Sequence, residues 1–172
     1  LGIVTQAETL DRFANLRTDP NLFANASAML EVVDHFALDQ VSDTRRYEML
    51  VGALKTLDSD PAPLVVPAFF LKLLTHEGLE PQLDRCTRCD SNGPLVSIDY
   101  HEGGVLCERC RRGRAVSEGS VAVMRSILGG GLSMALAVKD EQVCAEVESI
   151  THEAIEFHLE RRLRSRKVID QT

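Results

Sequence analysis

The sequence has no long apolar run, few aromatic residues and no recognisable secretion signal. No apolar run in the 172 residues is long enough to span a membrane, so a membrane-embedded protein is not expected. The start of the chain does not resemble a signal peptide, which favours an intracellular protein over a secreted one. Aromatic residues make up only 5% of the chain, too few to predict a base-stacking platform for single-stranded nucleic acid.

Positive charge and catalytic motifs are also scarce. The formal net charge is −7, so a site for polyanions has to be a local patch rather than the whole surface. No pairing of a nucleophile with a base is recognisable, and we predict that the protein is not an enzyme. The triple glycine at 129–131 lacks the Gly-Lys-Ser/Thr continuation of a phosphate-binding loop, and we interpret it as a break between helices.

The most informative motif is a pair of C-x2-C sequences. Cys86 and Cys89 are followed, after seventeen residues, by Cys107 and Cys110, a spacing typical of a tetrahedral zinc site. Four thiolates fill the coordination sphere, whereas a catalytic zinc keeps one position open for water or substrate. The pattern therefore predicts one structural Zn²⁺ held by these four cysteines.

Disulfides and a redox centre are the alternatives for paired cysteines. A disulfide framework is typical of small secreted chains, whereas this chain has the length and the hydrophobic share, 44%, for an ordinary core. A thioredoxin-like centre needs only one C-x-x-C beside a βαβ pattern, which leaves the second pair unexplained. We interpret His101, between the pairs, as a solvated loop residue and Cys144 as a small buried hydrophobe.

Basic residues are concentrated in two clusters, one around the cysteines and one in the last residues of the chain. Either cluster can bind phosphates or the carboxylates of an acidic partner. The first consists of Arg85, Arg88, Arg109, Arg111, Arg112 and Arg114, and the second of Arg161, Arg162, Arg164, Arg166 and Lys167.

Hydrophobic periodicity predicts six helices, because apolar residues repeat at spacings of three and four along each segment. Leu10 and Tyr47 are among the residues expected on buried stripes, together with either Met29 or Leu30. The expected helices cover residues 8–16, 20–36, 43–57, 64–74, 117–128 and about 140–164.

Capping residues mark three helix starts. Asp19 can cap the second helix with Pro20 at its first position, Ser42 or Asp43 can cap the third, and Ser117 can cap the fifth. Side-chain oxygens at these positions accept hydrogen bonds from the first backbone N–H groups, which have no partner inside a helix.

The segment 64–74 is the most apolar of the chain and is the expected centre of the core. Pro67 either places the start of this helix near residue 67 or introduces a kink. Gly78 is expected to end the helix in a left-handed conformation. Few residues separate Gly78 from Cys86, so we expect the metal module and the helical body to form one rigid unit.

A short ribbon is predicted between the cysteine pairs. Residues 95–100 alternate and are β-branched, 103–104 supply a glycine turn, and 105–106 begin a return strand. We therefore predict a mainly α protein, a helical bundle with an inserted four-cysteine zinc-ribbon module that carries a short β-hairpin. The expected parts are a first helical part at 1–84, a zinc-finger insertion at 85–114, and a second helical part with a basic end at 115–172.

Three stretches of the sequence resemble a known family. Residues 70–89 resemble the helix, the Gly-x-x-Pro and the first knuckle of the bacterial RecO recombination mediators, 103–110 resemble their second knuckle, and 159–167 resemble their basic C-terminal end. The resemblance implies a cytoplasmic, nucleoid-associated DNA repair protein. It also implies strand annealing and, together with RecR, loading of RecA onto DNA coated by single-stranded-DNA-binding protein.

The resemblance further implies an N-terminal OB-fold, and no stretch here resembles one. The chain begins at Leu1, which suggests a fragment or a processed product. We therefore expect this chain alone to bind single- and double-stranded DNA weakly. Two hypotheses follow: a repair mediator whose arginines contact phosphates or the acidic tail of single-stranded-DNA-binding protein, or a zinc-stabilised interaction scaffold without DNA contact.

Overall fold

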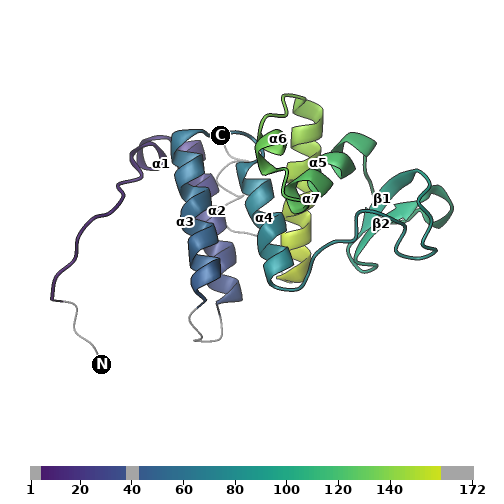
Figure 1. Cartoon of the computed structure of the whole chain (residues 1–172), viewed down its shortest axis with the longest axis horizontal. Helices are drawn as coiled ribbons and strands as arrows, with labels where there is room; N and C mark the ends of the chain where they lie inside the picture. Colours follow the sequence, from purple (N-terminus) through teal and green to yellow (C-terminus); the bar gives the residue numbers. More distant parts are fainter. Residues whose placement is uncertain (1–4, 38–42, 160–172) are drawn as a thin grey trace.

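The computed structural model of the chain describes residues 5–37 and 43–159. These residues form a helical body with a small β-ribbon at one end (Figure 1), which confirms the predicted fold class. The helices are α1 (Ala14–Thr18), α2 (Pro20–Phe36), α3 (Thr44–Ser59), α4 (Val65–His76), α5 (Glu118–Leu128), α6 (Leu132–Leu136) and α7 (Glu141–His158). The strands are β1 (Leu95–Asp99), β2 (Gly104–Cys107) and β3 (Arg114–Ala115), and a 3₁₀ turn, η1, covers Glu108–Cys110. None of the described helices is long and apolar enough to cross a membrane.

Helix α4 lies at the centre of the core, as its composition predicts. It stands between α2 and α3 on one side and α5 and α7 on the other (Figure 1). Phe70 and Leu73 belong to a hydrophobic cluster shared with α2 and α3, whereas Ala68 and Leu71 belong to a cluster shared with α5, α7 and the ribbon. A helix that is apolar on every side has to be surrounded in this way.

The two ends of α4 explain its unusual residues. Because α4 begins at Val65, Pro67 is its third residue, and the N–H that proline lacks is one that has no partner inside a helix anyway. The start therefore lies two residues before Pro67. Gly78 has a φ of 76°, its N–H donates to the Thr75 carbonyl, and the next N–H donates to Leu74 at 2.8 Å. This arrangement confirms the predicted left-handed end.

The predicted N-caps are present. The Asp19 carboxylate accepts from two backbone N–H groups at the start of α2, with Pro20 at the first position. Of the two candidates for α3, Asp43 is the cap and accepts from the Arg46 N–H at 2.9 Å. Ser117 caps α5. Three of the predicted helices therefore start where a side-chain oxygen can satisfy their first donors.

The first predicted helix, 8–16, is wrong in position. The structure forms only α1, from Ala14 to Thr18, and Leu10 is 92% exposed. The Asp11 carboxylate accepts from the Phe13 N–H at 3.1 Å, and Phe13 adopts a φ of 44°, which is incompatible with a helix through this point. Of the predicted apolar repeat, Leu16 and Phe13 contact the core, whereas Leu10 does not contribute to it.

Other sequence predictions need smaller corrections. Tyr47, in the first turn of α3, is 64% exposed rather than buried. Of the two alternatives in α2, Met29 is fully buried and Leu30 is exposed.

The triple glycine separates α5 from the short helix α6, which the periodicity did not predict. The last helix is described as far as His158, and its predicted continuation to residue 164 lies outside the described residues.

Candidate metal centre

The ribbon joins directly onto the end of α4. The Gln82 N–H donates to the Gly103 carbonyl at 2.9 Å, and the Gln82 carbonyl accepts from the Val105 N–H at 2.9 Å. Gly104 lies so close that a Cβ atom there would stand 2.2 Å from the Gln82 carbonyl oxygen, so only glycine fits. The connection between helix and ribbon is therefore short, as the sequence predicts, and Gln82 ties it to the ribbon through two backbone hydrogen bonds.

The ribbon is a three-stranded antiparallel sheet in the order β2-β1-β3. Ile98 of β1 pairs with Val105 on one side and with Arg114 on the other. The β1–β2 hairpin confirms the prediction. Strand β3 has only two residues, and this length is too short for an alternating pattern to reveal it.

Two tight turns present the four cysteines to one another. In the first, the Asp90 N–H donates to the Cys86 carbonyl at 2.9 Å. In the second, Cys107 ends β2 and Cys110 ends η1. The four Sγ atoms all lie within 4.8 Å of one another, and none of the four cysteines forms a disulfide.

The donor set and its spacing suit a metal ion. Tetrahedral coordination with metal–sulfur bonds of about 2.3 Å requires sulfur atoms roughly 3.8 Å apart, and the Cys89 and Cys107 Sγ atoms are 3.6 Å apart. Cys86 and Cys107 are buried, Cys110 is half-buried and Cys89 is exposed. The cluster can therefore hold one ion in a closed sphere of four ligands, with no position left for a substrate.

Backbone hydrogen bonds favour the thiolate form in part of the cluster. Burial raises the pKa of Cys86, but backbone N–H groups of Cys107, Arg88 and Cys89 outweigh it and lower the pKa to about 6. The backbone N–H of Cys110 lowers the pKa of Cys107. The Cys110 pKa rises to about 12, chiefly through the neighbouring Cys89 side chain. Crowded sulfurs hold a proton on Cys110 that a bound cation would displace.

Arginines of the first cluster differ in their partners. Arg85 pairs with Asp90 at 3.0 Å, and Arg88 lies 3.7 Å from Glu102. Arg112 also pairs with Glu102, at 3.0 Å. These guanidinium charges are offset by carboxylates on the same ribbon.

Asp99 is the second acid that holds Arg112. Its carboxylate accepts from the Arg112 Nε at 3.0 Å and from the N–H groups of His101 and Glu102. Burial raises the pKa of Asp99, yet the backbone and guanidinium donors outweigh it, so the pKa lies below its ordinary value. His101 itself is exposed, as predicted.

Tyr100 and Arg114 tie the ribbon to α7. The Tyr100 hydroxyl donates to the Ile150 carbonyl at 3.1 Å and lies 3.2 Å from Glu153. The Arg114 guanidinium pairs with the other Glu153 oxygen and donates to Ser149 Oγ at 2.8 Å. Burial, and then the Glu153 carboxylate, raise the pKa of Tyr100, so the hydroxyl remains a donor. Nothing in the local sequence pattern signals this junction.

Arg109 and Arg111 stand apart from the other four arginines. Both are exposed on or next to η1, between and after the last two cysteines. Within the described part of the chain, neither forms an ion pair or a side-chain hydrogen bond. Their charges are therefore available to an outside partner. The second cluster, Arg161 to Lys167, lies outside the described residues.

The fold and the cysteine cluster define a class, a helical protein with an inserted ribbon whose four cysteines can hold a metal ion. Comparison with protein families makes the assignment specific. The family model described as "Recombination protein O C terminal" matches residues 17–167. The chain therefore belongs to the RecO family, which confirms the resemblance seen in the sequence.

Individual relatives agree with the family assignment. DNA repair protein RecO of Frankia casuarinae is 35% identical over 171 residues, which cover 96% of this chain and 70% of that protein. DNA repair protein RecO of Thermobifida fusca is 31% identical, with 99% of this chain and 72% of that protein covered. The corresponding protein of Desulforamulus reducens is 26% identical, with 99% and 70% covered.

Proposed function

We propose that this chain is the zinc-stabilised helical part of a recombination mediator that assists strand annealing and, with RecR, the loading of RecA. Family membership implies a role in DNA repair and recombination. The zinc, the annealing activity and the RecR partnership are the proposal. In this role the protein acts by binding rather than by catalysis, in the bacterial cytoplasm and close to the nucleoid.

Zinc is the ion that best suits the cluster. Four sulfur donors lie within 4.8 Å of one another, those of Cys86, Cys89, Cys107 and Cys110, and zinc favours four thiolates in structural sites. The ion would tie the first cysteine turn to the second. All four ligand positions belong to the protein, so the role is structural.

Arg109 and Arg111 carry the proposed DNA contact. Each is exposed and unpaired within the described residues, so contact with a phosphate does not require an existing ion pair to break. Guanidinium groups bind phosphate oxygens through charge-assisted hydrogen bonds. Such contacts release counterions and read no sequence, so binding should weaken steeply with salt and respond little to base sequence.

A salt titration of paired variants tests this contact. Anisotropy of a labelled single strand would be measured on the full-length protein across a range of salt concentrations. Arg109→Gln with Arg111→Gln should lower the slope of log K against log salt by about 1.4, because each lost contact on a single strand removes roughly 0.7. Arg85→Gln with Arg88→Gln is the matched control, and we expect it to leave the slope nearly unchanged.

The scaffold is the second candidate function, and the ion pairs of the ribbon favour it. Four arginines of the ribbon are ion-paired with carboxylates of the chain itself: Arg85, Arg88, Arg112 and Arg114. Arginines that stabilise a fold, rather than bind an outside ligand, are paired in this way. If neither double variant changes DNA affinity by more than about threefold, roughly 0.7 kcal/mol, the scaffold without DNA contact is the better account.

The acidic tail of single-stranded-DNA-binding protein is the proposed alternative ligand of the same arginines. Carboxylates pair with guanidinium groups as phosphates do. A labelled tail peptide titrated against the same two double variants separates the ligands: a loss for DNA alone assigns Arg109 and Arg111 to phosphates, and a loss for the peptide alone assigns them to the protein partner. The basic C-terminal residues Arg162, Arg164 and Arg166 would be changed to Glu in a third variant.

A further inference from the structure

The four cysteines of the cluster differ in their access to solvent. Cys86 is 1% exposed and Cys107 is 4% exposed, and Cys110 is half-buried, whereas Cys89 is exposed. Backbone N–H groups also donate to the sulfurs of Cys86 and Cys107 and occupy lone pairs that a reagent would need. Of the four, Cys89 is therefore the cysteine most open to a reagent from solvent.

Cys89 combines exposure with a neighbouring sulfur. Cysteines that bind a metal do so as thiolates, and the thiolate is the form that oxidants attack. Sites of reversible oxidation are exposed and commonly have a second cysteine nearby that completes a disulfide. The Cys107 Sγ lies 3.6 Å from the Cys89 Sγ, so Cys89 meets both conditions when the metal is bound.

The two sulfurs can reach bonding distance with a small movement. A disulfide bond is about 2.05 Å long, so the Cys89 and Cys107 sulfurs need to approach by about 1.5 Å. Cys107 ends β2, whose four residues are all buried. Residues 88–90, by contrast, form an exposed turn. The movement therefore falls on the turn that carries Cys89.

We propose that Cys89 is an oxidation site for hydroperoxides and that Cys107 completes a disulfide with it, a step that rests on the zinc of the proposed function. The Cys89 thiolate attacks one oxygen of hydrogen peroxide, the O–O bond breaks, hydroxide leaves, and Cys89 becomes a sulfenic acid. The Cys107 thiolate then attacks the Cys89 sulfur, the S–S bond forms, and the S–O bond breaks to release a second hydroxide. Two protons from solvent convert both hydroxides to water, and the peroxide gains the two electrons that the two sulfurs lose.

The disulfide removes two of the four metal ligands. Cys86 and Cys110 alone do not close a tetrahedral site, so the zinc is lost together with the folding free energy that it supplies. Arg109 and Arg111 lie on or next to η1, between and after the last two cysteines. Oxidation at Cys89 should therefore also weaken the proposed DNA contact.

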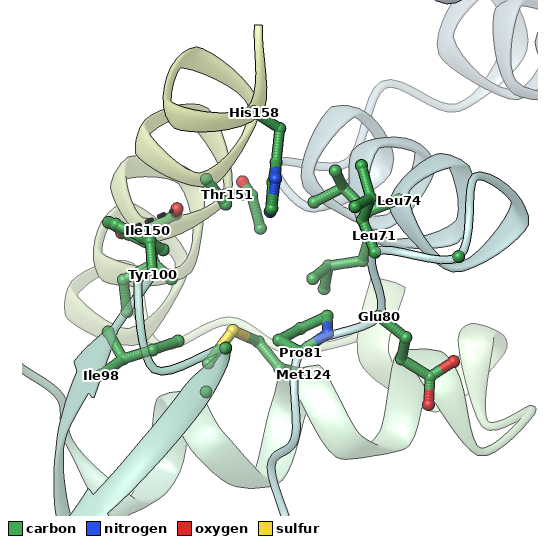
Figure 2. Close-up of a pocket in the computed structure, with 15 residues that line it drawn as sticks. Leu71, Leu74, Glu80, Pro81, Ile98, Tyr100, Met124, Ile150, Thr151 and His158 are labelled. Atoms are coloured by element: carbon green, nitrogen blue, oxygen red, sulfur yellow. Dashed lines mark hydrogen bonds between the residues drawn. The ribbon is translucent and has the colours of Figure 1, made fainter. Parts of the chain in front are cut away.

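The junction between the ribbon and the helical body should respond to loss of the metal. This junction encloses a pocket of about 230 Å³ (Figure 2), so the two parts are not in continuous contact. Figure 2 shows Ile98 and Tyr100 of the ribbon facing Leu71 and Leu74 of α4 across the pocket. We expect oxidation to shift the amide signals of Ile98 and Tyr100 and to leave that of Met29, buried in α2, unchanged.

Addition of peroxide to the zinc-loaded full chain tests the proposal. Zinc release would be followed with a coloured chelator, and disulfides would be mapped by mass spectrometry after alkylation of the free thiols. With peroxide limiting, we expect a Cys89–Cys107 disulfide among the first products, and zinc binding that returns after reduction by a dithiol with zinc added. Dimedone, which reacts with sulfenic acids, should label Cys89 before the other three cysteines of the cluster.

Two histidine variants form a matched pair, because three cysteines and one histidine also make a structural zinc site. Cys89→His removes the exposed sulfur and should slow the release of zinc by peroxide about tenfold. Cys110→His keeps Cys89 and Cys107 and should release zinc at close to the wild-type rate. Cys144→Ser, which is outside the cluster, should also behave like the wild type.

Zinc content measured before oxidation distinguishes the possible failures. A chain without zinc would overturn both the proposed zinc site and the oxidation site. A zinc-loaded chain that keeps its zinc in excess peroxide, or whose first dimedone label lies on another cysteine, would overturn the oxidation site alone. An unchanged release rate in Cys89→His would do the same. If the histidine variants do not bind zinc, the position of the label on the wild-type chain still decides.

Discussion

At the scale of single residues, Leu74 and Leu10 carry the same side chain in opposite surroundings. Leu74 is 1% exposed on α4, whereas Leu10 is 92% exposed. Leu74→Ala should reduce the free energy of unfolding by about 2–5 kcal/mol, because a cavity remains, and Leu10→Ala should change it by less than about 0.5 kcal/mol. Urea denaturation of both variants measures the difference. A loss below about 1 kcal/mol at Leu74 would mean that α4 is not the centre of the core.

The sequence predicts the roles of residues whose interaction partners lie only a few positions away along the chain. Asp19 caps the helix that begins at the next residue, and Cys86 meets Cys89 within one turn, so spacing alone identifies their roles. The partner of Arg114 could not be identified in this way. Glu153 lies 39 residues further along the chain, and the pair depends on how the ribbon docks against α7, which no short-range pattern encodes.

At the scale of elements, length decides what a pattern reveals. The long helices α2, α3, α4, α5 and α7 were all predicted, because each repeats its apolar spacing over several turns. Helix α6 has five residues and β3 has two, too few for any period to emerge. The helix predicted at 8–16 fails for another reason: its apolar repeat exists, but Leu10 is 92% exposed and Phe13 has a φ of 44°, which breaks a helix.

Glu146 joins two elements and gives them a pH dependence. Its carboxylate, on α7, accepts from the Ser117 N–H at 3.1 Å and from the hydroxyls of Ser117 and Ser120 at the start of α5. Burial raises the Glu146 pKa, but the serine donors outweigh it, and the pKa lies below its ordinary value. A carboxylate with a depressed folded pKa stabilises the fold above its unfolded pKa, about 4.3, and loses this effect as the pH falls through the folded value.

We therefore expect Glu146→Gln to destabilise the protein at pH 7, with a difference from the wild type that shrinks as the pH is lowered below about 4. Chemical denaturation of both proteins at each pH measures this difference. Taking the difference removes the effect of acid on the metal site, which both proteins share. A gap between the two that stays constant from pH 7 to about 3 would contradict the assigned role of Glu146.

At the scale of the whole molecule, the ribbon and the helical body depend on each other. The loop after α4 pairs with the hairpin through Gln82, and Tyr100 and Arg114 hold the ribbon against α7. The three strands contain few residues, so the ribbon has little core of its own beyond Leu106 and the cysteines. Small modules of this kind take their folding free energy from a bound metal.

The measurement that tests this account most directly is the metal content of the purified chain and of two cysteine variants. Elemental analysis should find one zinc per chain in the wild type and in Cys144→Ser, whose cysteine is buried on α7 away from the cluster. Cys107→Ser should lose the zinc and the dispersed amide signals of the ribbon, because three thiolates no longer close the site. A wild-type chain without zinc or iron, with all five thiols titrating as free, would contradict the account.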